Sequence, residues 1–218
     1  MGIIKTCLDY EWYCMADPGT KESAFAVNFI VLDRYKPKIY WIDEIYEIVP
    51  EQKVVGKIAP KILEKINEFN PDLRQWYFFY DPAAAAFNQE IIDRFPQLPF
   101  QPAKKRQGEK EDEIGKLIEI FEARIGVVSS RCVNTIWEFD NYYRDKLGRY
   151  IKKNDHAIDN SRYFLTMSGF DMKAKDDDER SNPPIRKKSR RYYSLEEDLR
   201  NMRSKSYKHA ILKRYDEV

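Results

Sequence analysis

Three aspartates lie at predicted ends of strands or near the predicted start of a helix. Asp17 follows an apolar segment, Asp81 follows an aromatic run, and each precedes a proline. Asp159 lies early in a segment with helical character. Carboxylates that converge repel one another unless a cation compensates them, and hard oxygen ligands suit Mg²⁺ or Mn²⁺. The pattern therefore predicts a divalent-metal site built from strand ends and a helix.

Two further residues accompany the third aspartate. His156 and Asp159 are three residues apart, so they share a helical face, where His156 could position or protonate a water. Asp155 stands at or near the N-cap of the same helix. The plainer reading is that the aspartates are ordinary turn and cap residues, with His156 a solvated helix residue.

The segments that must position these residues alternate in type. Three short strands joined by tight turns favour antiparallel pairing, and later strands alternate with helices, which indicates an α/β fold with a mixed sheet flanked by helices. The aromatic fourth strand indicates burial on both faces. If the first and fourth strands pair in parallel, Asp17 and Asp81 end side by side. The expected strands are 12–17, 24–32, 38–48, 76–80, 98–103 and 127–128, and the expected helices are 58–69, 83–95, 109–124, 133–139 and 155–165.

Three motifs in order resemble a known family. Residues 16–25, 79–87 and 154–163 resemble the three motifs of the nuclease domain of tailed-bacteriophage large terminase subunits. Segments 110–115 and 132–139 are similar to intervening family segments, and the resemblance spans roughly residues 12–165. The departures are small: Asn160-Ser161 stand where the family usually has alanine first, and Met15-Ala16 stand where glycine or valine is frequent.

The resemblance implies an RNase H-like fold, with three antiparallel strands and then parallel strands. It also implies an endonuclease that cuts concatemeric viral DNA during genome packaging with two divalent cations, Mg²⁺ or Mn²⁺. By the same resemblance Asp17, Asp81 and Asp159 are metal ligands, with Asp155 and His156 beside them. The implied partners are double-stranded DNA, the portal protein and the small terminase subunit, at the procapsid in the host cytoplasm.

A complete large terminase also carries an ATPase motor. No GxxxxGK[ST] phosphate loop occurs in this chain, so we expect the nuclease half of a longer polypeptide whose ATPase domain is absent here. Met1-Gly2 is read as an engineered start.

Basic side chains follow the fifth strand and surround a predicted hairpin over residues 141–153. They could neutralise phosphates on both sides of the metal site without reading base sequence, the plainer reading being a solvated face. The candidate DNA-binding residues are Lys104, Lys105, Arg106, Lys146, Arg149, Lys152 and Lys153.

Composition separates a domain from a tail. The 218 residues carry a net charge of +2, yet basic residues outnumber acidic ones beyond residue 165. We therefore expect a nuclease domain over 1–165 and a flexible, charged tail over 166–218 with one short helix, used for portal docking or for holding DNA. Three cysteines without CxxC spacing argue against a disulfide framework or a zinc site. No apolar run approaches ~20 residues, so no membrane span is expected.

Two other functions stay open at this point. One is a different RNase H-like nuclease, such as a junction resolvase or a transposase core. The other is a non-catalytic packaging adaptor that binds protein or DNA through its basic tail, which predicts no metal-dependent cutting.

Overall fold

The structure is a computed structural model that describes residues 10–20, 22–104, 110–151 and 153–172. Residues 6–172 belong to one compact unit; the rest of the chain, which includes most of the predicted tail, lies outside the described residues. Candidate DNA contacts Lys105, Arg106 and Lys152 also lie outside them. No helix within the described ranges is both long enough and apolar enough to cross a membrane.

A six-stranded mixed sheet forms the centre of the unit, in the order β5-β4-β1-β2-β3-β6. The first three strands pair antiparallel, and β4, β5 and β6 join by parallel pairing, β4 beside β1 and β6 beside β3. This arrangement confirms the expected fold class. The strands are β1 (Tyr10–Asp17), β2 (Phe25–Asp33), β3 (Lys38–Glu47), β4 (Trp76–Tyr80), β5 (Gln101–Pro102) and β6 (Gly126–Val128).

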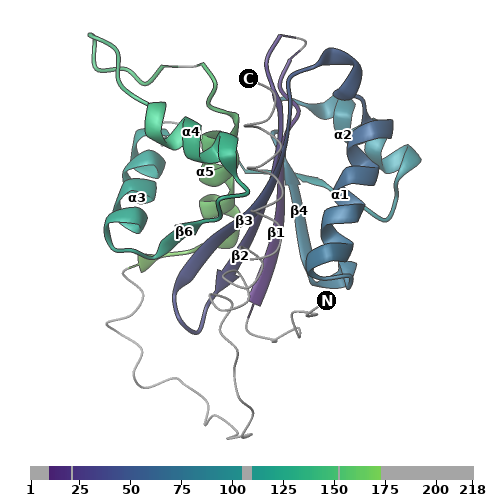
Figure 1. Cartoon of the computed structure of the whole chain (residues 1–218), viewed down its shortest axis with the longest axis horizontal. Helices are drawn as coiled ribbons and strands as arrows, with labels where there is room; N and C mark the ends of the chain where they lie inside the picture. The colour runs from purple at the N-terminus through teal and green to yellow at the C-terminus, as the bar shows by residue number, and fades with distance from the viewer. Residues whose placement is uncertain (1–9, 21, 105–109, 152, 173–218) are drawn as a thin grey trace, which may run out of the picture. The chain divides into compact units, whose positions relative to one another are not determined.

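Helices cover both faces of this sheet (Figure 1). On one face lie α1 (Val55–Phe69) and α2 (Ala85–Arg94). On the other lie α3 (Lys110–Glu122), α4 (Val133–Asn141) and α5 (His156–Ser168), with α5 against β1 and β2. Two 3₁₀ turns, η1 (Pro50–Gln52) and η2 (Leu73–Gln75), lead into α1 and β4. The helix α5 thus packs on β1, whose last residue is Asp17.

Burial explains why the sheet is the core. Every residue of β2 is buried, as expected for a strand that has helices on both faces. The apolar stripe of α1 is buried as predicted, from Ile58 to Phe69. One expectation was wrong in detail: Tyr77 of β4 is 50% exposed, so this strand is not buried on both faces along its whole length. On α3, Ile120 is buried and Ile118 is 49% exposed.

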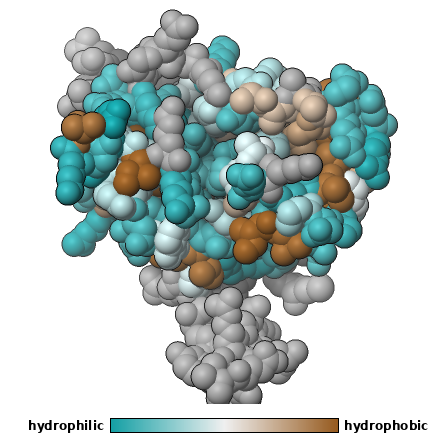
Figure 2. Space-filling view, turned by 90° about the horizontal axis from the view of Figure 1, so that it is seen from above, coloured by the Kyte–Doolittle hydropathy of each residue, from teal (hydrophilic) through white to brown (hydrophobic). Residues whose placement is uncertain are grey.

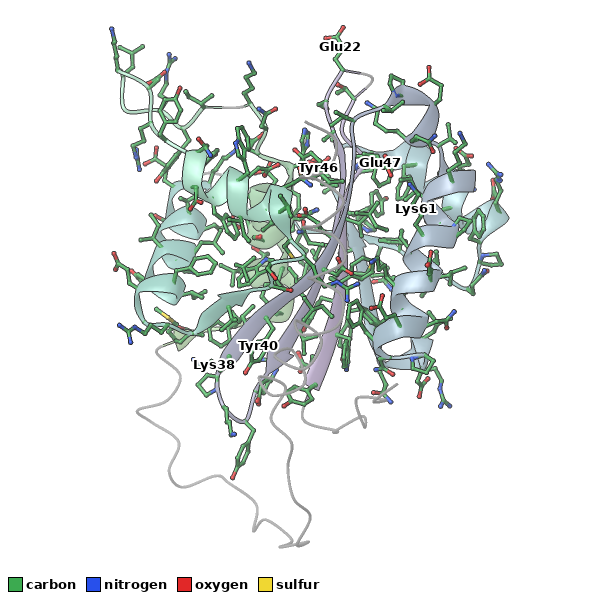
Figure 3. All side chains as sticks on the ribbon, in the orientation of Figure 1. Glu22, Lys38, Tyr40, Tyr46, Glu47 and Lys61 are labelled. Atoms are coloured by element: carbon green, nitrogen blue, oxygen red, sulfur yellow. The ribbon has the colours of Figure 1, made fainter. Side chains whose placement is uncertain are left out.

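The end of β3 shows how successive side chains reach different layers (Figure 3). Tyr46 donates its hydroxyl to Oε1 of Glu138 on α4 at 2.8 Å. Its neighbour Glu47 forms an ion pair with Lys61 of α1, on the opposite face. Alternation along a strand therefore ties β3 to both helical layers.

The predicted hairpin between α4 and α5 is present as a single antiparallel bridge between Arg144 and Tyr150. The rings of Tyr142 and Tyr150 stack with centroids 5.1 Å apart. The guanidinium of Arg144 lies 4.2 Å from the Tyr150 ring centroid. Aromatic and cation–π contacts stabilise this segment together with hydrogen bonds such as that from the Asp145 N–H to the Arg149 carbonyl at 2.7 Å.

Candidate active site

Parallel pairing brings two of the aspartates to neighbouring strand ends. Ala16 of β1 is paired with Tyr80 of β4, and the N–H of Asp81 donates to the Ala16 carbonyl at 2.9 Å. Asp17 is the last residue of β1 and Asp81 immediately follows β4, so the two aspartates lie at adjacent strand ends. We refer to this pair as the strand carboxylates.

Asp17 is held by a tight turn and by α5. Its Oδ1 accepts the Gly19 N–H at 2.9 Å, and its Oδ2 lies 2.8 Å from Nδ1 of His156. Gly19 has a φ of +60°, and a Cβ there would lie 2.1 Å from the Ala24 carbonyl oxygen, so only glycine fits. The Pro-Gly sequence therefore serves to aim a carboxylate that is 7% exposed.

Asp81 begins a second tight turn. Its Oδ1 accepts the Ala83 N–H and its carbonyl accepts the Ala84 N–H, at 2.9 and 2.8 Å. Both strand carboxylates thus use one oxygen to shape the turn that follows them. This is the turn chemistry that the plainer interpretation required, and it leaves the second oxygen of each group for other contacts.

His156 is the first residue of α5 and its side chain is 12% exposed. Burial alone would lower the pKa of His156, but the hydrogen bond to Asp17 and the negative charges of Asp17, Glu138 and Asp155 outweigh it, so the pKa is raised. The positively charged form of the imidazole is therefore favoured beside Asp17.

The first turn of α5 is capped from another helix. Asp155 stands at the N-cap position, as expected, but its side chain makes no capping hydrogen bond. Instead Glu138 of α4, 1% exposed, accepts the N–H groups of Ala157 and Ile158 at 2.7 and 3.1 Å. Burial raises the pKa of Glu138 to about 7, against the opposing effect of these donors and Tyr46. Sequence reasoning missed Glu138, because only the packing of α4 on α5 gives it this role.

Buried polar contacts fix how α5 faces the sheet. Asn160 donates to Oδ1 of Asn28 on β2 at 3.0 Å. Ser161 accepts the indole N–H of Trp41 on β3 at 3.0 Å and donates to the Ala157 carbonyl at 2.7 Å. Asn160 and Ser161 form one of the two places at which the sequence departs from the motifs that it resembles.

Asp155 and Asp159, the helix carboxylates, are already paired with cations. Lys110 places its Nζ 2.9 Å from Asp155 Oδ2 and 3.3 Å from Asp159 Oδ1. Arg162 bonds Asp159 at 2.6 Å and the buried Glu113 of α3 at 2.7 Å. Burial, with the charge of Asp155, nevertheless raises the pKa of Asp159.

The pKa of one tyrosine, Tyr163, responds to the charges of three aspartates. Burial raises the pKa of Tyr163 on α5, and the negative charges of Asp81, Asp159 and Asp17 raise it further. Within the described residues, however, no three His, Cys, Asp or Glu side chains are grouped tightly enough to hold a metal ion.

The residue types fit a divalent cation even so. The donors are carboxylate oxygens, which Mg²⁺ and Mn²⁺ prefer, and three carboxylates, Asp155, Asp159 and Glu113, share the two cations Lys110 and Arg162. The strand carboxylates are the residues best placed to provide the first ligands. The helix carboxylates would have to exchange a contact with Lys110 or Arg162 to join them.

Four of the candidate DNA contacts lie within the described residues, and all four are exposed. Arg149 is held by Asp145 at 3.1 Å within the hairpin. The end of the unit that carries the β1–β2 turn, marked by Glu22 in Figure 3, is seen from above in Figure 2 and is largely hydrophilic. The four residues are Lys104, Lys146, Arg149 and Lys153.

Known structures share this architecture, although no family model matches the chain and no characterised protein matches its sequence. The nuclease domain of the large terminase from bacteriophage SPP1, solved with bound Mn, aligns at 23% identity with a TM-score of 0.58. That alignment covers 72% of this chain and 86% of that domain. The nuclease domain of the P22 large terminase aligns at 15% identity and a TM-score of 0.61, over 78% and 87%. This chain has the fold of a large terminase nuclease domain.

The resemblance seen in the sequence is thus confirmed at the level of fold. In a longer terminase structure this fold makes up only part of the chain. The large terminase of a thermophilic bacteriophage, solved in complex with ADP, aligns at 17% identity and a TM-score of 0.61. The alignment covers 74% of this chain and 40% of that one, so the chain spans well under half of that large terminase.

Proposed function

We propose that this domain is a metal-dependent endonuclease that cuts concatemeric viral DNA during genome packaging. The observation that carries the proposal is the β1–β4 register, which puts Asp17 and Asp81 at adjacent strand ends with His156 2.8 Å from Asp17. The fold of terminase nuclease domains supports it. The proposed setting is the procapsid in the host cytoplasm, with the portal protein, the small terminase subunit and an ATPase domain of the same polypeptide as partners.

Two divalent cations, Mg²⁺ or Mn²⁺, would activate a water and stabilise the leaving oxygen of a phosphodiester when bound. In the proposal Asp17 and Asp81 hold them from the sheet, and Asp159 and Asp155 from α5. Asp17 also fixes the ring of His156 through Nδ1, which directs the other ring nitrogen, Nε2, to a water or a phosphate oxygen. The raised pKa of His156 suits a group that gives a proton to a leaving oxygen.

Exposed basic side chains would hold the DNA backbone next to these carboxylates. We propose this role for Lys104 after β5, for Lys146 and Arg149 in the hairpin, and for Lys153 before α5. Such contacts neutralise phosphates and position the duplex without selecting its sequence. Cutting without base specificity is the expected consequence.

The test is plasmid cleavage by the purified chain with Mn²⁺ or Mg²⁺ and with a chelator. Asp81→Asn removes one strand carboxylate while keeping an oxygen that can accept the Ala83 N–H. Asp93→Asn is the matched control, because Asp93 is an exposed carboxylate on α2, hydrogen-bonded to Gln89. We expect cleavage by the parent and by the control, and none by Asp81→Asn or in the chelator.

Three outcomes would redirect the assignment. Full cleavage by Asp81→Asn would show that the metal site does not depend on the carboxylate of Asp81. An absence of cutting by the parent in both metals would favour the non-catalytic adaptor, which agrees with the lack of a preformed three-ligand cluster among the described residues. Preference for branched over linear duplex would favour a resolvase-like nuclease.

A further inference from the structure

One lysine holds both helix carboxylates. The Nζ of Lys110 lies 2.9 Å from Asp155 and 3.3 Å from Asp159, and its side chain is 27% exposed. The ammonium is therefore a positive charge shared by two carboxylates.

The position of Lys110 in its own helix is unfavourable. It is the first residue of α3, where the positive end of the helix dipole disfavours a cation, and acidic residues fill the rest of that turn. The contacts that stabilise it come from α5 and from the hairpin. Its Nζ lies 5.9 Å from the ring centroid of Tyr142, which is stacked on Tyr150. A stack of two rings thus adds a cation–π contact to the two ion pairs.

This arrangement has the chemistry of an occupied cation position. Two carboxylates that would otherwise repel are held by one positive charge at hydrogen-bonding distance, as a metal ion would hold them. We propose that the Lys110 ammonium fills one cation position of the site, so that the resting domain binds one divalent cation at the strand carboxylates and admits a second at the helix carboxylates only by displacing Lys110. The proposal rests on the proposed metal-dependent nuclease function.

A consequence is that Lys110 sets metal affinity. Removal of its charge leaves Asp155 and Asp159 without their shared counter-ion, and only Arg162 remains on Asp159. A unit charge about 4 Å away has a large effect on the binding of a divalent ion even after screening, so we expect at least about tenfold tighter binding at the weaker site. Lys110 is thus a positioning residue, acting on the metal ligands.

The experiment is a calorimetric titration of the full chain with Mn²⁺, without DNA. Lys110→Met keeps the length of the apolar stem and removes the charge. Lys116→Met is the matched control, because Lys116 is exposed on the same helix. We expect Lys110→Met to bind a further equivalent of Mn²⁺, or to bind the second at least about tenfold more tightly, while the control matches the parent. Added Mn²⁺ should also raise the melting temperature of Lys110→Met more than that of the parent.

An unchanged or weaker titration of Lys110→Met would overturn the inference. If that variant does not fold, Lys110→Arg, which keeps the charge, decides: it should titrate like the parent, and tighter binding would contradict the role of charge. Metal binding and DNA cutting are read separately. Extra Mn²⁺ binding by Lys110→Met without cleavage by any form would support the inference and refute the nuclease function. Cleavage by the parent, with Mn²⁺ binding by Lys110→Met equal to that of the parent, would support the nuclease function and refute the inference.

Discussion

Glu138 gives the sharpest prediction about how the site is assembled. Glu138→Ala removes the acceptor of two backbone N–H groups in the first turn of α5 and of the Tyr46 hydroxyl. Each buried donor left without a partner costs about 1–3 kcal/mol, and a lost helix cap costs about 0.5–2 kcal/mol. We expect a loss of about 3 kcal/mol in the free energy of unfolding, which corresponds to about 6–12 °C in melting temperature for a domain of this size.

Glu138→Gln separates the charge of this group from its shape. The amide oxygen can still accept both N–H groups, so we expect a loss within about 1 kcal/mol at about pH 5, where Glu138 of the folded parent is largely protonated, and a smaller loss or a gain as the pH rises. The pKa of Glu138 is raised from the ordinary value of 4.5 to about 7. In the parent its contribution to stability is therefore fully present below pH 4.5 and is lost as the pH rises through about 7, by up to about 1.4 kcal/mol per pH unit.

Urea denaturation of the parent and both variants, at several pH values between about 5 and 8, measures these terms. The difference between the parent and Glu138→Gln should change with pH in the direction just given. His156 also has a raised pKa, so the comparison between variants matters more than either curve. Parallel curves, or a Glu138→Ala variant as stable as Glu138→Gln, would refute the capping argument.

Three other outcomes follow from the same geometry. His156→Ala should lower the cleavage rate with little loss of melting temperature, and a rate equal to the parent's in both metals would make His156 a structural partner of Asp17 alone. Gly19→Ala should destabilise the domain by about 1–3 kcal/mol in a denaturation assay, because φ is +60° and the Cβ meets a carbonyl; an unaffected midpoint would refute this strain. A chain ending at residue 172 should keep its fold and its metal-dependent cutting, whereas one ending at 165 should melt lower because it loses the last turn of α5 and the Thr166–Glu113 hydrogen bond; equal melting would contradict this.

The fold could be predicted from the sequence because the patterns that indicate its strands and helices are local. Short turns predicted the antiparallel strands, and the aromatic run at 76–80 predicted a buried strand. Its parallel pairing with the first strand, which the sequence left as a condition, is present in the structure. The adjacency of Asp17 and Asp81 follows from that pairing. Asp155 illustrates the limit: its place at the N-cap is a local signal, but its pairing with Lys110 depends on how α3 meets α5.

The same reasoning explains what the sequence missed. Glu138 and Lys110 lie 17 and 45 residues from Asp155, and nothing in their local pattern indicates a role at the site. Contacts of this kind become visible only when separate helices pack together. Side-chain direction is a second limit, as Tyr77 and Ile118 show, because a single strand or helix pattern does not say which neighbour covers each face.

The buried polar contacts of α5 restrict how this site can adapt. An apolar helix face can slide or rotate against a sheet at small cost, since one hydrophobic contact replaces another. Asn160 and Ser161 remove that freedom, because a rotation of α5 would break hydrogen bonds to Asn28 and Trp41 that water cannot replace in the core. Adjustment to a bound ion must therefore come from side-chain torsions and from the start of α3, while the backbone of α5 acts as a fixed reference.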